Sequence, residues 1–134
     1  MKTFRIAGAA VAAVALIGLA QSPASAATDV TVYGYNWGSC AHVSTGHFAS
    51  YGEVFTLYDS CAEGMAAVMK VDIAPYKANG GYDFDIWNTN GASGSPMTVN
   101  KEYAEDTGVC IQVGAGEYAS GEWGNWGNWS CGKA

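Results

Sequence analysis

Four cysteines place the strongest restriction on how this 134-residue chain can fold: Cys40, Cys61, Cys110 and Cys131. An even number of cysteines in a small exported chain indicates two disulfide bonds, for which three pairings are possible. Cys61 follows Cys40 by 21 positions, and Cys131 follows Cys110 by 21, so we favour these two pairs. Each would close a loop that stabilises the fold by ~3 kcal/mol. A zinc site is the weaker interpretation, because no C-x-x-C motif is present.

The N-terminus predicts the export that disulfides require. Lys2 and Arg5 open the chain, an apolar run follows over about 6–20, and the small residues "ASA" come next. This is the pattern of a secretory signal peptide, residues 1–26. The apolar run is shorter than the ~20 residues that a spanning helix needs. We expect cleavage after Ala26 or one residue later, and a secreted, extracellular product with no membrane attachment.

The mature chain, residues 27–134, has the size of a single domain. It keeps four lysines and all twelve acidic residues, which leaves a net charge of −8. Binding to nucleic acid or to an anionic membrane needs clustered Lys and Arg. We therefore expect neither of these partners.

Short alternating runs separated by glycine-rich turns predict strands and no helix in the mature chain. In "GMAAVMKVDI", the alternation buries Met69 and Val71 and turns Lys70 and Asp72 to water. In "YDFDIWN" it buries Tyr82, Phe84 and Ile86 opposite Asp83 and Asp85, with Trp87 able to share that outer face, and in "TGVCIQVG" it aligns Val109, Ile111 and Val113. Six or seven such strands predict an all-β fold, a single antiparallel β-sandwich or small barrel.

Turn and cysteine motifs over about 54–131 resemble those of small exported β-sandwich proteins of actinobacteria, a group mostly uncharacterised. The matching residues are Asp59, Glu63, Gly64, Trp87, Asn88, Gly91, Cys110 and Cys131. The resemblance implies a bacterial, disulfide-bonded sandwich and no particular activity. A looser likeness is to exported α-amylase inhibitors, which use an exposed Trp-Arg-Tyr turn. The mature chain contains no arginine.

Catalytic residues are hard to assemble from this sequence. His42 and His47 stand in "CAHVSTGHFASYG" and could form a triad with Ser44 or Ser50, but no G-x-S-x-G elbow accompanies them. We interpret the segment as a polar loop beside a disulfide. We therefore expect no enzyme and no cofactor.

Clustered carboxylates raise two further hypotheses. Asp83 and Asp85 are too close along one strand to flank a sugar as a glycosidase pair, and we expect them to be hydrated. A weak calcium candidate adds Asn88 and Asn90 to these two, although six to eight oxygens would be needed.

The last residues, "GEWGNWGNWSCGKA", contain three tryptophans three positions apart. In a regular strand Trp126 would point away from Trp123 and Trp129, whereas in an extended helix of three residues per turn all three would line one side. Two interpretations stay open. The rings either close the core beside Cys131 or form a platform for sugar rings.

The platform is our leading hypothesis for function, in the form of a non-catalytic protein that binds a polysaccharide or cell-wall glycan. The candidate ligand-binding residues are Trp87, Trp123, Asn125, Trp126, Asn128 and Trp129. The alternative is an inhibitor or structural protein that binds another extracellular protein through a protruding loop, either 89–96 or 41–52.

Overall fold

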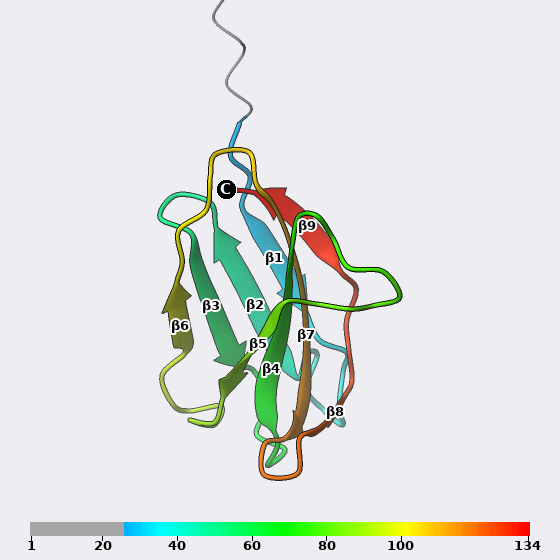
Figure 1. Ribbon diagram of the computed structural model, residues 1–134. Helices are drawn as coiled ribbons and strands as arrows, with labels where there is room; N and C mark the ends of the chain where they lie inside the picture. The colour runs from blue at the N-terminus through cyan, green and yellow to red at the C-terminus, as the bar shows by residue number, and fades with distance from the viewer. Residues whose placement is uncertain (1–25) are drawn as a thin grey trace, which may run out of the picture.

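The computed structural model describes residues 26–134, which form two antiparallel β-sheets packed face to face (Figure 1). The four-stranded sheet has the order β1–β2–β3–β6: β1 Val30–Tyr33, β2 Ser44–Ala49, β3 Val54–Asp59 and β6 Met97–Asn100. The five-stranded sheet has the order β5–β4–β7–β8, with β9 also paired to β7: β4 Ala66–Ile73, β5 Phe84–Asn88, β7 Gly108–Glu117, β8 Glu122–Gly124 and β9 Ser130–Lys133. The predicted all-β sandwich is confirmed.

The strand number was predicted wrongly: there are nine strands in residues 26–134, not six or seven. The segment expected to be a polar loop contains β2, which pairs with β1 on one side and β3 on the other. The inward-facing residues of β2 are Ser44, Gly46 and Phe48, so only one of the three is large and apolar. Gly46 must be small because a Cβ there would lie 2.5 Å from Cγ1 of the buried, β-branched Val113. A core position without a side chain leaves no alternation to detect.

The core fills the space between the sheets. Phe48 and Phe55 pack with ring centroids 4.9 Å apart, and Phe84 meets Phe55 edge-on. The predicted inward set of β7, Val109, Ile111 and Val113, is fully buried. Burial of this apolar surface is the main stabilising term of the domain.

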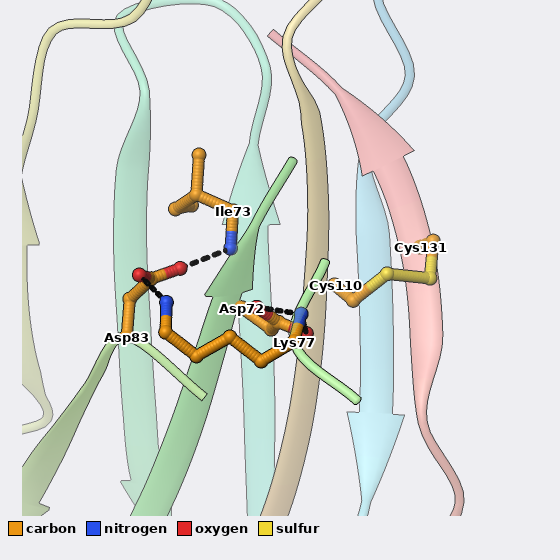
Figure 2. The surroundings of a disulfide bond; sticks show 6 residues. All are labelled: Asp72, Ile73, Lys77, Asp83, Cys110 and Cys131. Carbon is orange, nitrogen blue, oxygen red and sulfur yellow. Dashed lines mark hydrogen bonds and ion pairs between the residues drawn. A yellow bond between two sulfur atoms is a disulfide. The ribbon is translucent and has the colours of Figure 1, made fainter. Parts of the chain in front are cut away.

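The outer face of the five-stranded sheet is covered, which the sequence did not predict. Val68 is fully buried on this face and Asp72 is 6% exposed, although we expected Asp72 to face water. The β4–β5 loop folds over the face, and the Lys77 N–H donates to both Asp72 oxygens at 3.1 and 3.3 Å. Figure 2 shows the next link, in which Asp83 accepts from the Ile73 N–H and from the Lys77 ammonium.

Both predicted disulfides are confirmed: Cys40 pairs with Cys61 and Cys110 pairs with Cys131. Cys110 and Cys131 stand directly opposite each other on β7 and β9, beside the Asp72–Lys77 contact (Figure 2). Cys40–Cys61 instead ties the β1–β2 connection to the segment after β3.

The expected signal peptide, residues 1–26, lies outside the described residues except for Ala26. Within 26–134, the chain has no helix of a length and hydropathy that would let it span a membrane.

Candidate functional site

Five aromatic side chains converge on the outer face of the five-stranded sheet, and we call them the aromatic cluster: Tyr82, Trp87, Tyr118, Trp123 and Trp126. Trp87 and Trp123 stack with centroids 5.6 Å apart and planes tilted by 25°. Tyr82 and Trp126 meet Trp123 edge-on, and Tyr118 meets Trp87 in the same way. The three tryptophans are half-buried and Tyr118 is 62% exposed, so the cluster has both a packed base and a solvent side.

Strand alternation and register bring Trp87 and Trp123 to this face. Trp87 follows the inward-facing Ile86 on β5 and stands opposite Val68 of β4. Trp123 on β8 stands opposite Gly116 of β7. A Cβ at Gly116 would lie 2.8 Å from the Trp123 Cβ, so glycine at this position lets β8 approach with its tryptophan in place.

Trp126 reaches the same face because the chain leaves the regular strand after Gly124. Asn125 has a φ of 51°, in the left-handed region, which changes the direction of the backbone. The Trp126 ring then lies over Gly114, where a Cβ would be 2.8 Å from the ring atom Cε3. The chain therefore does not continue as a regular strand from Trp123 to Trp126, and the two rings meet on one face.

Lys70 lies within the aromatic cluster. Its ammonium is 3.8 Å from the centroid of the Trp126 ring and 5.3 Å from that of Trp123. Tyr82 is 5.4 Å away on another side. Cations at such distances over ring faces are attracted by the ring quadrupole. Burial lowers the pKa of Lys70. Burial raises the pKa of Tyr82, and the negative charge of Asp85 raises the pKa of Tyr82 further.

The remaining residues of the predicted site lie elsewhere. Trp129 is half-buried and lines a separate hollow with Lys77 and Cys110. Asn125 acts through its backbone, because its carbonyl oxygen accepts from the Tyr35 N–H at 3.0 Å. Asn128 is exposed beside the segment around His42. The structure thus unites Trp87, Trp123 and Trp126, and it leaves both asparagines and Trp129 outside.

Tyr82, Tyr118 and Lys70 belong to the site and were not among the site residues expected from the sequence. Tyr82 was expected in the core with Phe84 and Ile86, but β5 begins only at Phe84, and Tyr82 packs on Trp123 instead. Lys70 was expected to face water. Gly114 and Gly116 were an available signal. Glycines at outward positions of β7 leave space there for other residues to cover this face.

A hollow of about 520 Å³ adjoins the cluster at one end of the sandwich, with Tyr118 in its wall. Its size is within the range of small-ligand pockets. Asp59 lines it and is 8% exposed; burial raises the pKa of its carboxyl, against the hydrogen bond from the Cys61 N–H. Burial also raises the pKa of Glu63, and the Asp59 charge adds to this effect.

The histidine hypothesis finds no catalytic geometry in the described residues. His47 Nδ1 bonds with the Thr31 hydroxyl at 3.0 Å, while the Ser50 hydroxyl donates to Asp29 at 2.6 Å. His42 stacks on Tyr33 with centroids 4.6 Å apart. The Ser50 hydroxyl is therefore paired with a carboxylate and not with an imidazole, and the buried Ser44 hydroxyl has no hydrogen-bond partner, so neither serine has the arrangement of a triad.

The calcium candidate is also not assembled. Asp83 precedes β5 and binds Ile73 and Lys77, whereas the buried Asn88 amide donates to the Leu57 carbonyl at the far end of the strand. Asp85 accepts from Trp87 Nε1 at 3.3 Å. A strand extends by ~3.3 Å per residue, which separates these groups too widely for one ion. Across residues 26–134 no three His, Cys, Asp or Glu side chains gather as a metal site.

Comparisons with protein-family models, with curated proteins and with solved structures found no match to this chain. The fold class therefore rests on strand order and register, and any functional conclusion rests on the geometry of the aromatic cluster.

Proposed function

We propose that the mature chain is a secreted, bacterial, non-catalytic protein that binds polysaccharide or cell-wall glycan through the aromatic cluster. The observation that carries the proposal is the convergence of three tryptophans and two tyrosines on one sheet face. They come from the β4–β5 loop, β5, the β7–β8 turn, β8 and the segment after it.

Aromatic rings on a rigid sheet suit the apolar faces of sugar rings. Planar ligands stacked on aromatic side chains contribute ~1–3 kcal/mol each, as bases on protein rings show. Trp87 and Trp123 are nearly parallel, and Tyr118 extends their surface toward the hollow beside Asp59. Each neighbouring pair of centroids is 5.4–6.0 Å apart, so the five rings form one continuous aromatic surface on the sheet.

Secretion is part of the proposal and has two supports. The leader "MKTFRIAGAAVAAVALIGLAQSPASA" has the pattern of a signal peptide. All four cysteines are paired, and disulfides persist in oxidising compartments.

Retention on insoluble glycans tests the proposal. Oxidised mature protein is incubated with chitin, cellulose, starch and peptidoglycan, and bound protein is measured after washing. Trp126→Ala and Trp87→Ala should each lower retention about tenfold on the matrix that binds the wild type, since one stacked ring is worth on the order of a kcal/mol.

Trp37→Ala is the matched control, because Trp37 is 50% exposed in the β1–β2 connection and makes none of the ring contacts of the cluster. It should bind like the wild type, and circular dichroism should show that all three variants fold. Equal retention of folded Trp126→Ala, Trp87→Ala and wild type would exclude the cluster as the glycan site. Retention on none of the matrices would count against the function itself.

A protein-binding role is the second candidate, and the β1–β2 connection favours it. Tyr35 is 58% exposed and Trp37 is 50% exposed there. The Cys40–Cys61 disulfide and the paired backbone bonds between Trp37 and Cys40 hold the loop. Rigid exposed Tyr and Trp are typical anchors of protein interfaces. Of the loops expected for this role, 41–52 is largely strand β2.

If this second role is correct, Trp37→Ala should abolish binding to the target protein, and Trp126→Ala should not. A crosslinking experiment on secreted protein, run with both variants, separates the two candidates.

A further inference from the structure

Two of the lysines, but not Lys70, form ion pairs among the described residues. The Lys77 ammonium pairs with Asp83, and the Lys133 ammonium lies 3.9 Å from Asp106. Among residues 26–134, no carboxylate lies within ion-pair distance of Lys70. Lys101 also has no ion pair among the described residues, but it is exposed, whereas Lys70 is half-buried.

The cross-strand neighbours of Lys70 form no ion pair with it. Asp85 stands opposite Lys70 across β4 and β5, on the same outer face. Its Oδ2 accepts from Trp87 Nε1 at 3.3 Å. On the other side, Gln112 stands opposite Lys70 on β7, and its Nε2 donates to the Gly127 carbonyl at 2.8 Å. The ammonium is therefore flanked by side chains with other partners, and its described neighbours are aromatic rings.

We infer that Lys70 recognises a carboxylate carried by the sugar rings that pack on the aromatic cluster, so that the ligand is a glycan containing uronic acids. This inference rests on the proposed glycan-binding function and names its substrate class. An ammonium has three donors, and its hydrogen bond to a carboxylate is about twice as strong as a neutral one.

The surroundings of Lys70 strengthen such a contact. The residue is half-buried among rings, where water competes less for the ammonium than at an exposed surface. Burial also lowers its pKa, which reflects the incomplete solvation of its charge. A ligand carboxylate would supply the missing counter-charge at the position where sugar rings would stack.

The acidity of the rest of the chain sets the conditions for the test. A net charge of −8 on the mature chain repels polyanions at long range. At ~0.15 M salt the Debye length is ~8 Å, so this repulsion is screened while a partly desolvated contact is screened much less. Binding should therefore be measured at that ionic strength.

The experiment compares polygalacturonate with its fully methyl-esterified form, which keeps the sugar backbone and removes the charge. Alginate and hyaluronan, each with its methyl ester, are tested in the same way. Affinities are measured by affinity electrophoresis and titration calorimetry for wild type, Lys70→Gln, Lys70→Arg and Lys101→Gln. Lys101 is the matched control, since its ammonium also lies over a ring, 4.8 Å from the Phe84 centroid, away from the cluster.

We expect wild type to bind at least one acidic glycan about tenfold or more tighter than its ester. Lys70→Gln should lose that preference and bind both forms alike, Lys70→Arg should keep part of it, and Lys101→Gln should match wild type. Thermal unfolding should show that every variant is folded.

Five outcomes would overturn the inference. Equal binding of acid and ester by wild type, or an unchanged preference in Lys70→Gln, would remove the role of Lys70 and leave the glycan-binding function intact. A loss in Lys70→Gln that is equal for acid and ester would show that Lys70 only supports the rings. Retention on neutral matrices without binding to any polyuronide would reject the uronic acid class alone. Binding to no glycan in either experiment would reject the proposed function together with the inference.

Discussion

The outer faces of the two sheets differ, although both are built from strands with the same alternation. Outward positions of the four-stranded sheet include four threonines, Thr31, Thr45, Thr56 and Thr98, and the exposed Tyr33 and Tyr58 near one end. On the five-stranded sheet, Gly114 and Gly116 occupy outward positions of β7, and the aromatic cluster lies over them. Val68 is fully buried on that face, whereas Thr56 is half-buried and Thr31 and Thr98 are exposed on the other.

Covering one face of a sheet requires space above its central strand as well as side chains that can fill that space. Threonines stand upright from a sheet and leave no space for a ring beneath them. Glycines on the central strand β7 let Trp126 and Trp123 approach the backbone itself. The covering rings come mostly from turns and the chain end, so the face is completed by segments outside the central strands.

The largest expected effect comes from filling the space under the cluster. Gly114→Val would place a Cβ against the Gly124 carbonyl and the Trp126 ring, and backbone atoms cannot move aside. We expect a loss of about 4 kcal/mol or more in the free energy of unfolding, measured with urea. Thr56→Val introduces the same side chain on the open face, and it should change the free energy of unfolding by less than about 0.5 kcal/mol. Similar losses for both variants would mean that the two faces do not differ in packing.

Removal of the disulfide on the covered face should cost somewhat less. Replacing both Cys110 and Cys131 by Ala should lower the free energy of unfolding by ~3 kcal/mol, since the loop of 21 positions gains entropy when unfolded. Replacing Cys40 and Cys61 by Ala opens a loop of the same length and should cost a similar amount. In a Trp37→Phe background, which removes the tryptophan paired with Cys40, only the first pair should also shift the tryptophan fluorescence spectrum, because it joins β9 to β7 on the face of the cluster. An unshifted spectrum in a folded Cys110/Cys131 variant would uncouple that disulfide from the aromatic face.

Shortening a side chain on the covered face tests the same difference in packing between the two faces. Val68→Ala removes two buried methyl groups and should cost about 2 kcal/mol, from lost burial and a small cavity. Thr56→Ala on the open face should cost less than about 1 kcal/mol, the span of strand propensities. Thermal unfolding of both proteins measures the contrast. A Val68→Ala protein as stable as the wild type would show that the rings do not seal this position.

The smallest effect concerns the end of the sandwich, at the hollow between the two sheets. Burial raises the pKa of Asp59 above 3.8, so the folded state holds this proton more tightly than the unfolded state. The contribution of Asp59 to stability therefore increases as the pH falls through its folded pKa toward 3.8, and ionisation is unfavourable at neutral pH. Asp59→Asn should raise Tm at pH 7 by less than about 4 °C, and the gain should disappear below pH 3.8.

Thermal scans between pH 3 and pH 8 measure this dependence, with Glu102→Gln at an exposed position as the control. A gain for Asp59→Asn that is the same at every pH would assign the effect to packing rather than to ionisation.

The strands that were predicted correctly are those in which large apolar residues alternate. Phe55 and Leu57 in β3, and Ile111 and Val113 in β7, show the period of two without help from the rest of the chain. Strand β2 was missed because its inward residues Ser44 and Gly46 are small where the opposite sheet comes close. Strands β8 and β9 are short and contain glycine, so their sequences show no alternation that would predict a strand. They are recognised as strands only by their pairing with β7.

The candidate site divides in the same way. Trp87 was recognised as a possible outer-face residue, and the C-terminal tryptophans were recognised as a possible platform. Trp129 did not join the cluster, because the chain turns at Asn125 and again runs along β7 as β9. Tyr82 and Lys70 gave no signal, since Tyr82 packs on Trp123 and Lys70 lies over Trp126, and both tryptophans are more than forty positions away.

The all-β class could be predicted from the amino-acid sequence, and the spacing of the cysteines favoured the two pairs that form. Both follow from local spacing: a period of two along each strand, and two equal separations between cysteines. The tertiary structure alone decided which aromatic rings meet and which lysine they surround. Trp87 and Trp123 come from strands that are not paired with each other. They stack because the strand order β5–β4–β7–β8 places both strands in one sheet, with the two rings on the same face. Strand order depends on how two whole sheets bury their apolar faces, which is a property of the packed chain and not of any one segment.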